Sequence, residues 1–159
     1  MPSTTGTTPA VAVMQRRERS AADEAGELLP HDAIPAWARD VVARAARDCA
    51  AGRNDAVIRA TDGLDATATV DDPTALLLVY RAVALARVGL FRSAMTVFRR
   101  VLGAHDRGRD LRHFALRQRA EVYAAEGRRA QARRDLRAIV TEDPTAADAK
   151  ERLVQLRAR

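Results

Sequence analysis

Apolar residues recur at helical spacing through most of the chain. Val57, Ala60 and Leu64 follow the i, i+3, i+7 pattern of an amphipathic helix, and residues 94–102 repeat it. Residues 75–88 are apolar nearly all round, which predicts a helix covered on two sides in the middle of the domain. No segment alternates as a half-buried strand does. The pattern therefore predicts an all-α chain.

Glycines and prolines divide this pattern into seven helices, because glycine ends helices and proline begins or stops them. The predicted helices cover residues 35–51, 54–64, 75–88, 93–102, 111–126, 128–141 and 145–157. Short turns join them as three antiparallel pairs, with the last helix left over. Residues 35–158 are thus expected to form the folded domain.

The first thirty residues have a different character. Residues 1–9 are rich in Ser, Thr, Gly and Pro and cannot bury enough apolar surface to become ordered. Residues 11–29 carry a thin apolar stripe that includes Met14, Ala21 and Ala25. We expect residues 1–30 to be a disordered or weakly helical arm, loosely docked, whose removal leaves the melting transition nearly unchanged.

Two of the helix pairs match each other at a constant offset of 38 residues. The landmarks Ala82, Leu85, Gly89, Phe91, Ala94, Phe98 and Val101 correspond to Ala120, Tyr123, Gly127, Arg129, Ala132, Leu136 and Ile139. The alanines allow close helix contact, the glycines supply the turns, and the large side chains fill the space between pairs. A repeated helical hairpin accounts for all of these positions.

These landmarks resemble the tetratricopeptide repeat (TPR), a helix–turn–helix unit of about 34 residues. The loop at residues 103–110 accounts for the longer spacing, and Pro144 matches the closing proline of the family. Residues 37–73 depart from the pattern, since Asp48 stands at the usual aromatic position. Over residues 36–157 the resemblance implies a short right-handed α-solenoid of about three helix-turn-helix pairs plus a C-terminal capping helix. A plain helical bundle is the alternative.

The resemblance also implies a concave groove, lined by the first helix of each pair, that binds a peptide or a partner helix. The groove-facing candidates are Leu76, Val79, Tyr80, Val83, Arg87, Phe114, Arg117, Gln118 and Glu121. The first members of this set are apolar and suit an apolar partner segment. The alternative is that the N-terminal arm or the first helix pair covers them. Val79 and Val83 stand where family members that clamp a C-terminal carboxylate carry polar groups, so we do not expect that activity.

The net charge of +6 is unevenly distributed, with −4 in residues 1–73 and +10 in the remainder. Arg129, Arg133 and Arg137 recur every four residues and form a candidate patch for an anionic partner. Of 27 basic residues 26 are arginine, a bias typical of a GC-rich, bacterial-like genome, and no stacking aromatics accompany the patch. Because the C-terminal half is basic, nucleic-acid association through this half is the alternative function.

The sequence shows no catalytic, metal-binding or cofactor-binding motif. His31, His105 and His113 are scattered, and Cys49 follows the helical apolar period of a core residue. The longest apolar run, residues 75–80, is too short to span a membrane, and the arginines after Met14 are in the wrong order for an export signal. These features predict a cytoplasmic protein that is not an enzyme, needs no cofactor and has no membrane partner.

The main hypothesis is a non-enzymatic, TPR-like adaptor or regulator that binds a protein or peptide partner. Self-association through the apolar face of residues 75–80 is a further hypothesis.

Overall fold

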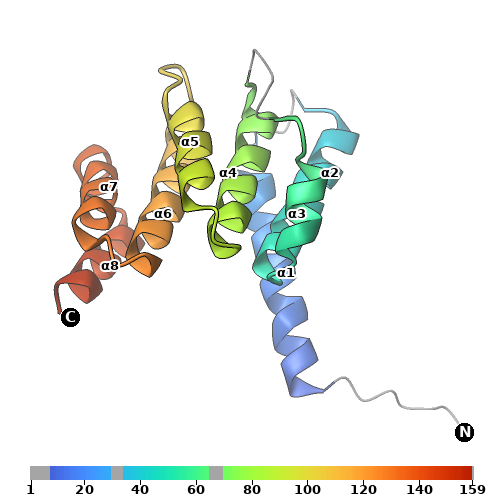
Figure 1. Cartoon of the computed structure of the whole chain (residues 1–159), viewed down its shortest axis with the longest axis horizontal. Helices are drawn as coiled ribbons and strands as arrows, with labels where there is room; N and C mark the ends of the chain where they lie inside the picture. Colours follow the sequence, from blue (N-terminus) through green and yellow to red (C-terminus); the bar gives the residue numbers. More distant parts are fainter. Residues whose placement is uncertain (1–7, 30–33, 65–69, 159) are drawn as a thin grey trace, which may run out of the picture.

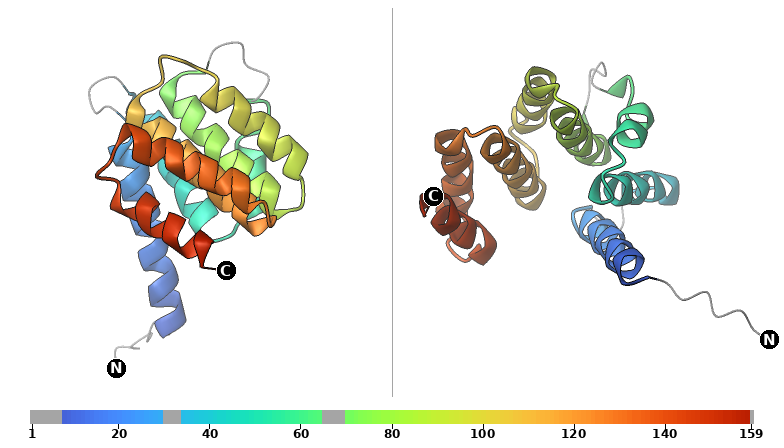
Figure 2. Two further views of the ribbon diagram at one scale, coloured as in Figure 1. Left: turned by 90° about the vertical axis from the view of Figure 1, so that its left-hand side faces the viewer. Right: turned by 60° about the horizontal axis from the view of Figure 1, so that its bottom comes forward.

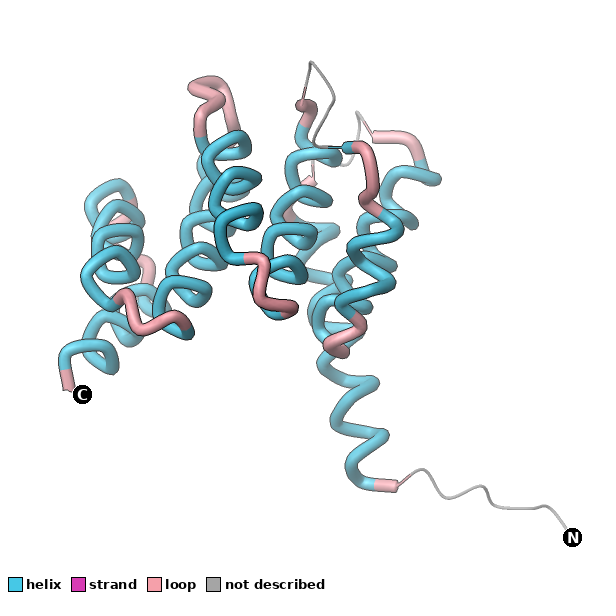
Figure 3. Tube along the Cα trace, viewed as in Figure 1, coloured by secondary structure: helices cyan, strands magenta, loops and turns pink. Residues whose placement is uncertain are grey.

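The computed structural model describes residues 8–29, 34–64 and 70–158, and over these residues it is entirely helical, without strands (Figures 1 and 3). The prediction of an all-α chain is confirmed. The helices are α1 (Pro9–Glu27), α2 (Ala36–Ala50), α3 (Asn54–Ala60), α4 (Asp72–Arg87), α5 (Phe91–Leu102), α6 (Arg109–Ala125), α7 (Arg129–Glu142) and α8 (Ala147–Arg157).

The turns after α2, α4 and α6 share one backbone geometry. Gly52, Gly89 and Gly127 all have a positive φ, between 73° and 88°, which glycine adopts without the penalty that a Cβ brings. At Gly89 the amide donates to the carbonyl of Ala86 at 3.0 Å, and the next amide, that of Leu90, donates to Leu85 at 2.9 Å. This pair of bonds satisfies the last carbonyls of the helix and reverses the chain.

Consecutive helices pack as neighbours. α4 packs against α5, α6 against α7, and α1 against α2, while α2, α3 and α6 also contact α4. One view in Figure 2 shows the helices following one another along an arc, with α1 and α8 at its two ends. α4 is therefore the helix with the most neighbours, in agreement with its apolar sequence.

The buried apolar residues form two clusters. The larger one unites α1 to α6 around α4, ten of whose residues are buried. The smaller one lies between α6, α7 and α8 and contains Ala132, Leu136 and Ile139. α6 contributes residues to both clusters and thus forms the boundary between them.

The N-terminal arm predicted from the sequence is helical from Pro9 to Glu27. Its first half extends beyond the rest of the molecule (Figure 1), and Val11 there is 47% exposed. Its end belongs to the core, since Ala25 and Leu29 are 0% and 2% exposed. Glu18 also pairs with Arg53 at 2.9 Å. Residues 1–7 and residue 30 of the predicted arm lie outside the described residues.

None of the described helices combines the length and the apolar character that crossing a bilayer requires.

Candidate partner-binding surface

A polar groove runs along α6. It consists of four neighbouring depressions of about 250 to 480 Å³ each. One of them is lined by Arg117, Gln118 and Glu121, and each of the other three shares at least one of these residues with it. Its other walls come from α4, α8 and the end of α1. We call this continuous surface the α6 groove. Its floor and rim carry charged groups of both signs.

The structure divides the predicted partner-binding residues into two groups. Those that line the α6 groove are Val83, Arg87, Arg117, Gln118 and Glu121. Val83 is only 4% exposed, so the accessible surface comes mainly from the other four residues. Those in the interior, at most 5% exposed, are Leu76, Val79, Tyr80 and Phe114. The second group cannot contact an external partner in this arrangement of the helices.

The apolar residues of α4 are buried because helices cover it on nearly every side. Leu76 and Val79 are fully buried, and the rings of Tyr80 and Phe114 meet edge to face with 5.8 Å between their centroids. Burial, helped by nearby acidic groups, raises the pKa of the Tyr80 hydroxyl far above its usual range. The face of residues 75–80 that we considered for self-association is at most 9% exposed, so it belongs to the core as well.

Charged side chains link the walls of the α6 groove. The Arg117 guanidinium donates to Asp148 of α8 at 2.6 Å and lies 3.4 Å from Glu24 of α1. Arg152 of α8 donates through two nitrogens to the Glu121 carboxylate, at 2.7 and 2.8 Å. Ion pairs across the groove therefore connect α6 with α8 and with the end of α1.

These ion pairs are partly hydrated. Arg117 and Arg152 keep about a third of their side chains exposed, at 34% and 32%, and their partners Asp148 and Glu121 keep more than half. Exposed pairs of this kind contribute about 0–1 kcal/mol. A partner that offers its own carboxylates or cations can therefore replace them at small cost.

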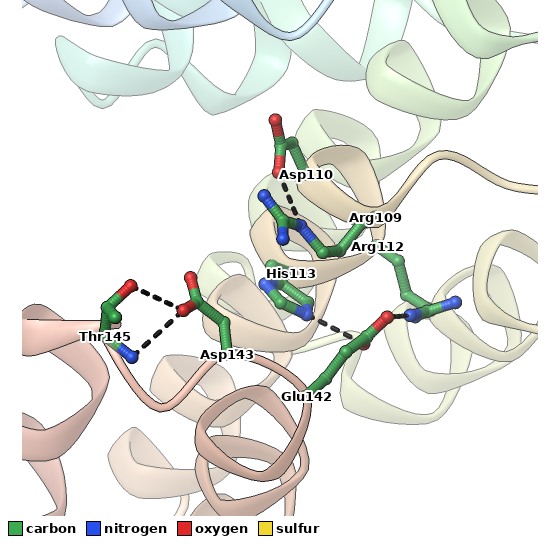
Figure 4. A network of polar contacts seen from close by, with 7 residues as sticks. All are labelled: Arg109, Asp110, Arg112, His113, Glu142, Asp143 and Thr145. Carbon is green, nitrogen blue, oxygen red and sulfur yellow. Dashed lines mark hydrogen bonds and ion pairs between the residues drawn. The ribbon is translucent and has the colours of Figure 1, made fainter.

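A second polar network joins the start of α6 to the end of α7 (Figure 4). Glu142 accepts hydrogen bonds from Arg112 and meets Nε2 of His113 at 2.8 Å. The hydrogen bond from Arg112 and, to a smaller extent, that from His113 lower the pKa of the Glu142 carboxyl. This network fixes the turn from which α8, and with it one wall of the groove, continues.

Thr145 does not cap α8 but shapes the turn that precedes it. Its amide and hydroxyl donate to the Asp143 carboxylate at 3.0 and 2.6 Å, which lowers the pKa of that carboxyl, and α8 begins at Ala147 without a side-chain cap. The bonds to Asp143 shape the turn itself.

The arginine patch predicted on α7 is only partly open to solvent. Arg137 is exposed, Arg129 forms part of the groove edge, and Arg133 is half-buried, with its Nε buried and lacking a hydrogen-bond partner. Other arginines of the basic half act as structural links. Arg107 is 7% exposed and pairs with Asp72 at 2.9 Å. Arg119 makes two bonds of 2.7 Å to the buried Asp135.

Among the residues that the structure describes, the histidines and the cysteine do not share a site. His31 lies outside the described residues, and His113 belongs to the network with Glu142. Cys49 is buried, which raises the pKa of its thiol, and its carbonyl accepts a 2.6 Å bond from Arg87. Within residues 8–29, 34–64 and 70–158 no group of His, Cys, Asp and Glu side chains is arranged to hold a metal ion.

Sequence reasoning missed the residues that α1 and α8 contribute to the groove, namely Glu24, Asp148 and Arg152. No local signal marks them, because each meets its partner across at least 31 positions of the chain. Comparisons of the chain with protein-family models, curated proteins and solved structures give no match.

Proposed function

We propose that this chain is a TPR-like interaction module, an adaptor or regulator, whose α6 groove binds a peptide or a helix of a partner protein. The repeat at an offset of 38 residues, the shared turn geometry at Gly52, Gly89 and Gly127 and the arc of helices support a short α-solenoid. In such a fold, successive hairpins combine to offer one extended surface.

The observation that carries this proposal is the continuity of the α6 groove. Arg117, Gln118 and Glu121 lie one helical turn or less apart and are each shared by adjoining depressions. A surface that is long, open and charged with both signs suits an extended chain better than a small molecule, which is usually enclosed in an apolar pocket.

The chemistry of the lining suggests the kind of segment that binds. Near α4 the groove contains Val83, Ala86 and Val122, and near α8 it contains the pairs of Arg117 and Arg152. A partner segment with a small aliphatic side chain at one end and charges of both signs at the other complements both parts.

The experiment that tests this proposal places a photoreactive amino acid at position 118, in the middle of the groove, and irradiates cells of the native host. We expect a covalent adduct with one partner protein, identified by mass spectrometry. The same photoreactive residue at Arg134, exposed on α7, is the matched control. Identical adducts at both positions, or none from position 118, would contradict the proposal.

The alternative, a nucleic-acid-associated protein, has less support. Arg107, Arg112, Arg117, Arg119 and Arg152 all have carboxylate partners within the chain, so their charges are already compensated.

A further inference from the structure

A second surface, away from the α6 groove, lies at the turn between α4 and α5. A shallow depression of about 830 Å³ opens there, and it shares no lining residue with the α6 groove. We call this surface the turn patch and define it by Leu90, Phe91, Arg92, Met95, Arg99 and Arg128.

The apolar part of the turn patch is centred on Leu90, which is 51% exposed. Phe91 and Met95 beside it are half-buried. The two backbone bonds of the Gly89 turn fix the main chain at Leu90, so only its side-chain rotamers remain to be ordered when a ligand covers it. A half-exposed leucine beside an aromatic ring provides an apolar anchor point.

Comparison with the equivalent turns shows that an apolar residue is not required at this position. The residue after the turn glycine is Arg53 in the first turn and Arg128 in the third, with the same pattern of backbone bonds. Arg53 forms ion pairs with Glu18 and Asp48, whereas Arg128 lies over the Phe91 ring at 4.6 Å. Only Leu90, among these three, leaves half of an apolar side chain in water.

The rim of the turn patch is basic and lacks a compensating carboxylate. Arg99 donates only to the Met95 carbonyl, at 3.4 Å, and to the Thr96 hydroxyl, at 3.2 Å. Within the described residues, neither Arg92, Arg99 nor Arg128 forms an ion pair, in contrast to Arg117 and Arg152 of the α6 groove. The chain has no Asp or Glu from Pro73 to His105.

These observations indicate an acidic ligand with an apolar side chain. Guanidinium groups bind carboxylates through paired hydrogen bonds, and Leu90 offers contact to an aliphatic or aromatic side chain. A single-stranded nucleic acid fits less well, because base stacking needs a free aromatic face and Arg128 occupies one face of Phe91. We propose that the turn patch binds an acidic, amphipathic peptide segment of a partner protein.

The test uses the full chain and a short fluorescein-labelled peptide in which glutamates flank leucines, with binding followed by fluorescence anisotropy. Leu90→Ser and Arg92→Glu are each expected to weaken binding about tenfold or more, through lost apolar contact and lost charge attraction respectively. A peptide with glutamine in place of glutamate is expected to bind as weakly to the unchanged protein.

Matched variants keep this test specific. Val154→Ser removes an apolar side chain that is 63% exposed on α8, and Arg134→Glu makes the same charge change on the exposed face of α7. Both are expected to bind the peptide normally, and far-ultraviolet circular dichroism verifies that all variants fold. Gln118→Trp, which fills the α6 groove, is also expected to leave binding unchanged, so this proposal and the proposed function can fail separately.

Three results would overturn the proposal. One is the absence of peptide binding even at low salt. Another is an equal loss of binding in Arg92→Glu and Arg134→Glu, which would mean unspecific charge attraction. The third is tighter binding of single-stranded DNA that is lost in the same two turn-patch variants, which would make this surface a nucleic-acid site.

Discussion

The α4–α5 and α6–α7 hairpins share a turn geometry but differ in the polar contacts between their helices. In the first, ten residues of α4 are buried, and they meet α5 through apolar contacts around Phe98. The second also has an apolar cluster, to which Arg119 and the buried Asp135 add a doubly hydrogen-bonded pair and Glu142 adds bonds with Arg112 and His113. The same hairpin therefore accepts charge pairs beside its apolar contacts at one position and, within the described residues, lacks them at the other.

The position of each hairpin explains the difference. α4 is covered by α2, α3, α5 and α6, and an ion placed there would lose its hydration on every side, which costs several kcal/mol per ion. The α6–α7 hairpin lies nearer the end of the arc (Figure 2), where water still reaches side chains such as Glu142, which is 37% exposed. Each charge pair of this hairpin has a member that water still reaches, Glu142 in one and Arg119, whose side chain is 19% exposed, in the other.

Truncation of equivalent core residues in the two hairpins is expected to give the largest losses of unfolding free energy. Phe98→Ala is expected to cost about 4 kcal/mol of unfolding free energy and the equivalent Leu136→Ala about 3 kcal/mol, because each leaves a cavity in a fully packed site. Both residues are at most 2% exposed. Urea unfolding followed by circular dichroism measures both values, and a larger loss in Leu136→Ala would show that the smaller cluster dominates stability.

The buried ion pair of the second hairpin gives the next largest effect. Asp135→Ala is expected to cost about 3 kcal/mol, because it leaves the Arg119 charge without its partner. The double variant Arg119→Met with Asp135→Leu should recover most of this loss by replacing charge with apolar contact. The same unfolding measurements on Arg119→Met, Asp135→Leu and the double variant complete the cycle. No recovery in the double variant would mean that the pair is required for packing as well as charge balance.

Removal of α1 is expected to destabilise the larger apolar cluster. A chain that lacks residues 1–29 should lose about 2 kcal/mol, because Leu29 and Ala25 no longer cover the larger cluster. A chain that lacks only residues 1–17 keeps the pair between Glu18 and Arg53 and should unfold almost as the full chain does. Equal stability of all three chains would support the loosely docked arm that the sequence suggested.

The smallest expected effect is the pH dependence of the second hairpin. Hydrogen bonds from Arg112 and His113 hold the pKa of Glu142 below its ordinary value of 4.5. A carboxyl whose pKa is lower in the folded state stabilises the fold above its unfolded pKa, and this contribution is lost as the pH falls through the lowered value. Urea unfolding at neutral and acidic pH should therefore show a smaller acid-induced loss for Glu142→Gln than for the matched Glu126→Gln. An identical loss in both would contradict this assignment.

Much of the local structure could be predicted from the residue pattern. The turns at Gly52, Gly89 and Gly127 and the central position of residues 75–88 follow from glycine chemistry and from apolar spacing, both of which act over a few residues. The groove could be predicted only in part. Arg117, Gln118 and Glu121 line it, but Val79 and Tyr80, at the positions equivalent to Arg117 and Gln118 one repeat earlier, are buried.

The amino-acid sequence by itself determined which segments are helices, where they turn and which faces are apolar, because these properties depend on neighbours within one or two helical turns. Only the tertiary structure decided which apolar face is covered by α1, which arginines pair with distant carboxylates, and which leucine remains in water at the turn patch. These outcomes depend on residues that are far apart in the chain, such as Glu24 and Arg117, and meet only when the helices pack.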